Sequence, residues 1–148
     1  MKKLLALIGL CSFAEAKEII NDKFLDSVAM IESNFNYDAV GDKGKARGAY
    51  QMHKGAWADA EKRLELKYDW KTFSTDSFIS RMYCREYFKI LYFQFLNKYH
   101  KTPTNIELYM AYNMGFNGAD EYAFIPNNLA LPEKNLRILN KAKYIFAQ

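Results

Sequence analysis

Glu32 is the residue of this sequence that is best placed for general acid chemistry. A carboxylic acid that donates a proton near neutral pH needs surroundings that disfavour its charged form. Apolar periodicity before Glu32 predicts that it lies at the C-terminal end of a helix, where the helix dipole places partial negative charge. Ile31, Phe35 and Tyr37 can reduce its solvation further. A carboxyl of this kind suits cleavage of a glycosidic bond, whereas position alone would also fit an ordinary solvated glutamate.

Four short motifs occur in order along the chain, and one contains Glu32. They are residues 31–36 (Ile-Glu-Ser-Asn-Phe-Asn), 39–42 (Ala-Val-Gly-Asp), 48–52 (Gly-Ala-Tyr-Gln-Met) and 111–115 (Ala-Tyr-Asn-Met-Gly). Together they resemble the catalytic domain of the soluble lytic transglycosylases, which is related in fold to goose-type lysozyme. The resemblance covers about residues 24–122, and four ordered motifs are more specific than any one of them.

The resemblance implies a role for each matching residue. Glu32 would protonate the leaving oxygen between two sugars of peptidoglycan and then take a proton from the C6 hydroxyl of muramic acid. Ser33 would orient the substrate or its N-acetyl group, and Gln51 would line the cleft. Tyr112 and Asn113 would hold Glu32 and the sugar in register. Apart from Glu32, each residue also has a structural alternative, which is to end a helix or to satisfy backbone groups of a loop.

Two departures from the family pattern alter the predicted cleft without removing a catalytic group. Tyr37 replaces a common proline, and Ala49-Tyr50 replaces a common Leu-Met before the glutamine. Tyr50 is predicted to bind substrate, because aromatic rings such as those of Tyr50, His53 and Trp57 can stack on sugars. The helical spacing of Trp57 favours the core for that side chain.

Two other functions remain open on the sequence. A lysozyme-type muramidase, which is a hydrolase, would need a second carboxylate near Glu32, and Asp38 or Asp42 could supply it. Acidic residues in a turn rich in Asn and Gly more often make local hydrogen bonds. The third possibility is a non-catalytic peptidoglycan-binding or assembly protein, against which the retention of Glu32 and all four motifs argues.

Helices must position these residues. Apolar periodicity, a capping box at Thr104 and Glu107, and Pro132 in a first turn predict helices over residues 18–34, 53–66, 76–99, 104–114 and 132–146. Residues 35–48 contain three glycines and predict turns, with a short hairpin. The expected fold is mainly α: a lysozyme-like single domain with an irregular or β-hairpin-like loop after the first helix.

The N-terminal residues predict export. Residues 1–16 combine a basic start, a short apolar run and an A-x-A site, which is the pattern of a secretory signal peptide. Residues 17–148 would then form the catalytic domain, in a periplasmic or extracellular location. Cys11 raises the alternative of a lipoprotein, but the preceding Leu10 is larger than lipid modification favours.

Composition limits the partners. A net charge of +4 is too small to indicate nucleic acid and suits an anionic wall polymer. Only Cys84 remains after the leader, and no His or Cys cluster has metal-ligand spacing, so we expect no cofactor and no metal. We expect a monomer acting on peptidoglycan glycan strands. Its small size also resembles transglycosylases of secretion, conjugation or phage assembly machinery.

Overall fold

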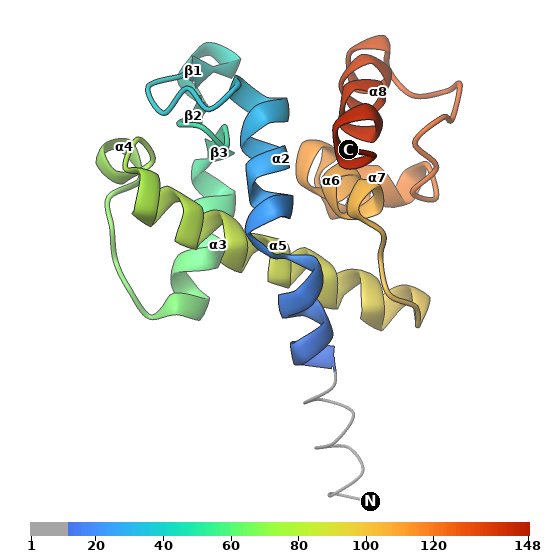
Figure 1. Cartoon of the computed structure of the whole chain (residues 1–148), viewed down its shortest axis with the longest axis horizontal. Helices are drawn as coiled ribbons and strands as arrows, with labels where there is room; N and C mark the ends of the chain where they lie inside the picture. Colours follow the sequence, from blue (N-terminus) through green and yellow to red (C-terminus); the bar gives the residue numbers. More distant parts are fainter. Residues whose placement is uncertain (1–11) are drawn as a thin grey trace, which may run out of the picture.

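The computed structural model describes residues 12–148 and is mainly helical. Residues 12–19 are helical, and the elements that follow are α2 (Asp22–Ser33), β1 (Val40–Gly41), η1 (Asp42–Gly44), β2 (Ala46–Arg47), β3 (Met52–His53), α3 (Lys54–Leu64), α4 (Trp70–Phe73), α5 (Ser77–Tyr99), α6 (Asn105–Met114), α7 (Phe116–Glu121) and α8 (Glu133–Phe146). In Figure 1, α2 stands between two groups of elements, with the strands and α3 on one side and α6 to α8 on the other. The predicted fold class is confirmed.

Four of the five predicted helices lie within two residues of their expected bounds, and the first begins later than expected. The chain bends at residues 20–21, and the side chain of Asn21 accepts a hydrogen bond from the backbone N–H of Phe24 (2.9 Å), so α2 begins at Asp22. The capping box at Thr104 and Glu107 is confirmed. Pro132 lies at the N-cap of α8, one residue before the position expected for it.

Two short α-helices that lie between the predicted helices were not expected from the sequence. One is α4, which lies in a segment expected to be only a connector. The Asp69 side chain accepts a hydrogen bond from the backbone N–H of Thr72 (2.9 Å) and so begins this single turn. The other is α7, which begins directly after Gly115, whose φ of 75° allows the chain to turn sharply between two helices.

The glycine-containing segment forms the predicted hairpin and one strand more. The three strands are antiparallel in the order β1-β2-β3, with Gly41 opposite Ala46 and Arg47 opposite Met52. Gly48 links the second and third strands with φ +74°, and a Cβ there would lie 1.9 Å from the carbonyl oxygen of Ser74. Only glycine fits this approach, which holds the sheet against the end of α4.

Helix α5 is the centre of the core, as its apolar residues on several faces predict. Its buried side chains include Tyr83, Cys84, Phe88, Leu91 and Phe95. The helix begins where the Asp76 carboxylate accepts hydrogen bonds from two backbone N–H groups. It packs against α3 on one side and α6 on the other, so both groups of elements are built on the same helix.

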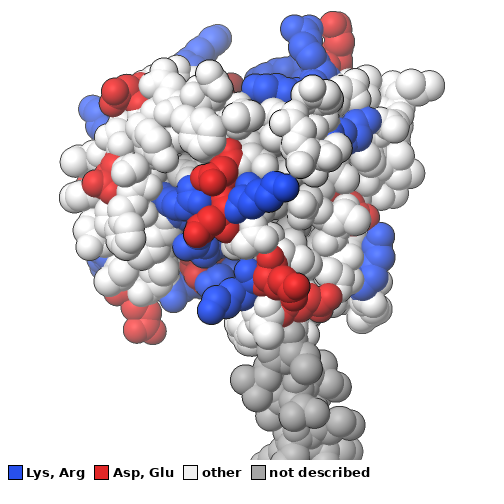
Figure 2. Space-filling view, in the orientation of Figure 1, with Lys and Arg blue, Asp and Glu red and all other residues white. Residues whose placement is uncertain are grey.

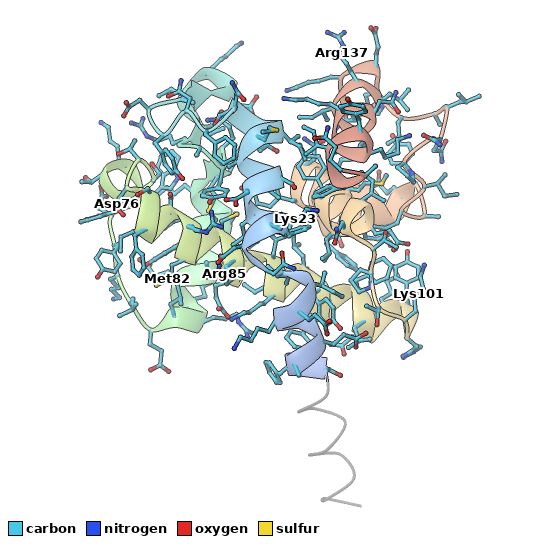
Figure 3. All side chains as sticks on the ribbon, viewed as in Figure 1. Lys23, Asp76, Met82, Arg85, Lys101 and Arg137 are labelled. Atoms are coloured by element: carbon cyan, nitrogen blue, oxygen red, sulfur yellow. The ribbon has the colours of Figure 1, made fainter. Side chains whose placement is uncertain are left out.

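A network of ion pairs joins the start of α2 to α5. Arg81 contacts Asp22 and Asp26, and Arg85 also contacts Asp22. Figure 2 shows acidic and basic side chains alternating at the centre of this face, and Figure 3 shows Arg85 and Lys23 on either side of the lower end of α2. The charges on this face therefore largely compensate each other.

Within residues 12–148, no helix is both long enough and apolar enough to cross a membrane. Most of the predicted leader, residues 1–16, lies outside the described residues. Its last part packs on the domain: the Phe13 and Phe93 rings lie 4.7 Å apart, and Ala16 is buried.

Candidate active site

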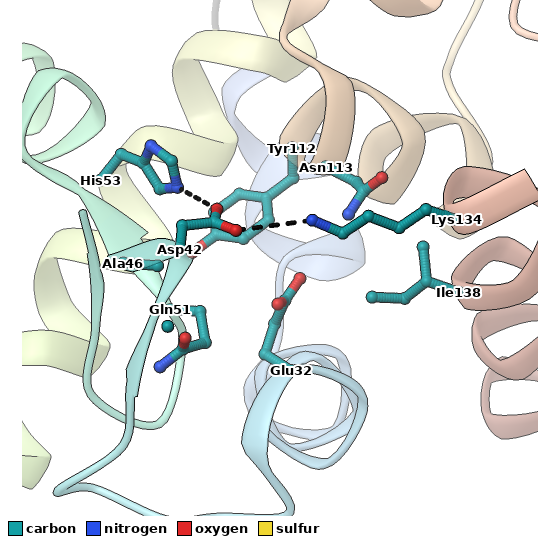
Figure 4. Close-up of a pocket in the computed structure, with 10 residues that line it drawn as sticks. Glu32, Asp42, Ala46, Gln51, His53, Tyr112, Asn113, Lys134 and Ile138 are labelled. Atoms are coloured by element: carbon teal, nitrogen blue, oxygen red, sulfur yellow. Dashed lines mark hydrogen bonds and ion pairs between the residues drawn. The ribbon is translucent and has the colours of Figure 1, made fainter. Parts of the chain in front are cut away.

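Glu32 lies in the last turn of α2 and points into a cleft between the two groups of elements (Figure 4). The cleft has a volume of about 210 Å³. Its lining residues come from α2, the sheet region, α6 and α8 and are Glu32, Gly41, Asp42, Ala46, Gln51, His53, Tyr112, Asn113, Lys134 and Ile138. The sequence predicted four of the polar members as site residues, and the fold brings them together.

The surroundings of Glu32 raise the pKa of its carboxyl into the neutral range. Burial raises its pKa from 4.5 to about 7, and the negative charge of Asp42 adds to this rise. A hydrogen bond from Tyr109 and the positive charges of Lys141 and Lys134 act in the opposite direction. Desolvation outweighs all of these opposing effects, so the group can donate a proton where an ordinary glutamate is already ionised.

Sequence reasoning missed Lys134 and Ile138 of the cleft wall, and it also missed Tyr109, which contacts Glu32 directly. Tyr109 is fully buried in α6, and its hydroxyl donates a hydrogen bond of 2.7 Å to Oε1 of Glu32. Helical spacing could have indicated it, because Tyr109 precedes Tyr112 by three residues and so lies on the same face of α6. Tyr112 was expected to hold Glu32, but its hydroxyl donates to the backbone oxygen of Tyr50 (2.5 Å).

The residues expected to shield Glu32 do so only in part. Ile31 is buried in the core, whereas Phe35 is 38% exposed and adopts a left-handed conformation with φ 62°. This conformation follows the left-handed C-cap at Asn34 and turns the chain away from the helix axis. The direct cover of the carboxyl comes from α6, through Tyr109.

Ser33 connects α2 to the sheet region. Its hydroxyl donates a hydrogen bond to the backbone oxygen of Ala49 (2.8 Å) and accepts one from the backbone N–H of Asn36 (3.0 Å). These bonds fit the structural alternative, in which Ser33 ends its helix. The role of Ser33 in orienting the substrate stays a prediction.

Gln51 lines the cleft and also fixes the loop around it. Its Nε2 donates to the backbone oxygens of Gly48 (2.9 Å) and Ala39 (3.3 Å). Its Oε1 lies over Gly41, where an added Cβ would approach to 2.2 Å. Asn113 lies across the cleft, and its Oδ1 accepts a hydrogen bond of 2.8 Å from Asn135.

The expectation that Tyr50 offers a sugar-stacking face is corrected by its burial. Tyr50 is 1% exposed, and its hydroxyl accepts a hydrogen bond from Arg81 (3.2 Å), so its ring belongs to the core. Trp57 is also in the core, stacked on Tyr83 with ring centroids 3.9 Å apart. Of the three proposed stacking residues, His53 alone lines the cleft.

Asp42 forms a charged bridge across the top of the cleft (Figure 4). Its carboxylate contacts Nε2 of His53 at 3.0 Å and Nζ of Lys134 at 3.4 Å, and the hydrogen bond with His53 is the main cause of its lowered pKa. Asp38, the other candidate for a second carboxylate, is exposed and is not part of the lining. No group of three or more His, Cys, Asp or Glu residues among residues 12–148 is arranged to hold a metal ion.

A mainly helical domain with a small antiparallel sheet, in which a desolvated glutamate ends a helix at a polar cleft, has the architecture of the lysozyme-like enzymes. The chain belongs to the transglycosylase SLT domain family, which it matches over residues 9–130. The match begins inside the predicted leader and ends before α8. No curated protein sequence matches the chain significantly. Membership of this family indicates an enzyme fold that acts on peptidoglycan.

Proposed function

We propose that the protein is a peptidoglycan lytic transglycosylase that cleaves the β-1,4 bond between N-acetylmuramic acid and N-acetylglucosamine and leaves 1,6-anhydromuramic acid ends. The observation that carries this proposal is the raised pKa of Glu32 at the cleft. Its carboxyl lies in an open cleft and has a pKa of about 7, so one group can both donate and accept a proton near neutral pH.

The reaction balances without water. The Glu32 carboxyl donates its proton to the glycosidic oxygen as the bond from this oxygen to C1 of muramic acid breaks. The C6 hydroxyl oxygen of the same sugar then bonds to C1, and its proton returns to the Glu32 carboxylate. Tyr109 donates its hydrogen bond to Oε1 of Glu32 and stabilises the carboxylate between the two steps.

Asp42 supports hydrolysis as the second candidate function. It lines the same cleft as Glu32, and its lowered pKa keeps it ionised, as a nucleophile or a base for water requires. Its contacts with His53 and Lys134 favour a structural role, because they occupy both carboxylate oxygens, which a nucleophile or a base would need free.

The products distinguish the two reactions. We expect digestion of purified peptidoglycan to release muropeptides that mass spectrometry finds lighter by one water than their reducing counterparts. The Glu32→Gln variant should release none. Products that carry only reducing muramic acid ends would assign the protein as a hydrolase, and Asp42 would then be the first residue to substitute.

The proposed substrate lies outside the cytoplasm, so we also propose that residues 1–16 direct export and that the mature domain begins at residue 17. The A-x-A site and the substrate class of the family support this proposal. N-terminal sequencing of the protein recovered outside the cytoplasm tests it, because a first residue other than Lys17 would place the cleavage elsewhere.

A further inference from the structure

Helix α8 forms one wall of the cleft through a single face. Lys134 and Ile138 line the cleft with Glu32, and Lys141 follows them at the next helical spacing. Residues separated by three or four positions lie on the same side of a helix. Lys141 therefore lies on the face of α8 that the cleft already uses, one turn deeper along the wall.

Lys141 contacts the backbone that carries Glu32. Its Nζ donates a hydrogen bond of 2.7 Å to the backbone oxygen of Ile31 and another of 3.3 Å to that of Met30. The last carbonyls of a helix have no partner within the helix. The Asn34 backbone N–H bonds to the Met30 oxygen, and Lys141 adds a donor from outside α2 to both carbonyls.

The same contacts place a positive charge at the negative end of the α2 dipole. A cation at this position stabilises a helix end. It also connects α8 to α2 at the base of the cleft, so a shift of α8 would move both the wall and the acid. The pairing bridges 110 positions of sequence.

We infer that Lys141 is a positioning residue for Glu32, which fixes the last turn of the catalytic helix from α8. The inference rests on the proposed function, in which Glu32 is the catalytic acid and base. Lys141 lies beyond residue 130, where the family match ends, so this wall of the site comes from a part of the chain outside the match.

Other groups that act on the charge of Glu32 come from each element packed around it. They are Tyr109 of α6, Asp42 of η1 and Lys134 of α8. Burial is the main cause of the raised pKa values of Cys84 of α5 and Tyr112 of α6, and the charge of Glu32 in turn adds to both. Two groups lower the pKa of Glu32 most: the hydrogen bond from Tyr109 has the larger effect, and the positive charge of Lys141 comes second. Loss of that charge should therefore raise the pKa of Glu32, while the other groups stay in place.

The test compares three variants with the unmodified protein by carboxyl NMR titration of Glu32 and by kcat/KM on peptidoglycan. Lys141→Met removes both the charge and the donor, and Lys141→Arg keeps them. Arg137→Met removes one positive charge from the same helix: Arg137 is exposed at the upper end of α8 (Figure 3) and pairs with Glu133.

For Lys141→Met we expect the pKa of Glu32 to rise by about half a pH unit, because solvent screens the ammonium, and kcat/KM to fall by about fivefold. Lys141→Arg should keep the pKa of Glu32 and kcat/KM close to those of the unmodified protein. Arg137→Met should match the unmodified protein in both measurements. If Lys141→Met does not fold, Lys141→Gln keeps a donor without the charge and should still raise the pKa.

An unchanged Glu32 titration in Lys141→Met, or in Lys141→Gln if the former does not fold, would overturn the inference, as would an equal effect of Arg137→Met. The titration needs no turnover, so it tests Lys141 even if the protein releases no anhydromuramoyl ends. Failure of the proposed function would show in the products, and failure of the positioning role would show in the NMR titration.

Discussion

Replacing Glu32 with glutamine should abolish cleavage and make the fold more stable at neutral and alkaline pH. The carboxyl has a folded-state pKa of about 7, against an ordinary value of 4.5. A group whose pKa is raised by folding binds more protons in the folded state, so stability falls as pH rises from 4.5 through 7. At about 1.4 kcal/mol for each pKa unit, the ionised carboxyl destabilises the fold by about 3 kcal/mol above this range.

Glutamine avoids this loss because it stays neutral and its oxygen can still accept the hydrogen bond from Tyr109. Denaturant unfolding of both proteins, from well below pH 4.5 to well above pH 7, measures the difference. The two should coincide at the acid end and separate by up to about 3 kcal/mol at the alkaline end. Glu121→Gln, which changes an exposed carboxyl at the end of α7, is the matched control.

Parallel stability curves for Glu32→Gln and the unmodified protein would refute the raised pKa. If the variant were nevertheless inactive, Glu32 would be catalytic without being protonated in the free enzyme. A variant that still clears cell-wall suspensions at the normal rate would refute the mechanism itself.

Other substitutions test the rest of the site. Tyr109→Phe removes a hydrogen bond that lowers the pKa of Glu32, so the alkaline limb of the kcat/KM profile should move to higher pH and kcat/KM should fall by about tenfold; an unchanged profile would make Tyr109 structural only. Asp42→Asn should move that limb to lower pH and still yield anhydromuramoyl ends, whereas loss of all products would favour hydrolysis. Gly48→Ala should lower the free energy of unfolding by at least about 1–3 kcal/mol in denaturant titrations, because its Cβ would meet the Ser74 carbonyl, and equal stability would contradict this packing.

Local signals were sufficient for most of the fold. The capping box at Thr104, the side chain of Asp76 and the apolar spacing of α5 act within a few residues, so each can be recognised in the sequence. Helix α4 was missed because a single turn is too short to show periodicity, although Asp69 carried its N-cap signal.

The site was predictable only where motifs are contiguous. Glu32, Gln51 and Asn113 lie in the cleft as their motifs imply. Burial of Tyr50 could not be predicted, because Tyr50 lies in the turn between β2 and β3, where no periodicity shows which side chains meet the core. Helical spacing from Tyr112 places Tyr109 on the cleft face of α6, but its contact with Glu32 spans 77 positions, so the sequence does not show which group its hydroxyl meets.

The wall that α8 supplies has a consequence for the time at which the acid becomes active. During synthesis, α2 and the sheet become available long before α8, which contacts α2 across 110 positions. Until α8 packs, water reaches Glu32 from that side, and the carboxyl should titrate nearer its ordinary value of 4.5 and be ionised at neutral pH. A partly folded chain should therefore be unable to cut glycan. The loop between α7 and α8 is exposed, with Leu129 94% exposed, so a protease that cuts this loop could release α8 and inactivate the enzyme. Wall-cutting activity that persisted after cleavage in this loop and release of α8 would contradict this dependence.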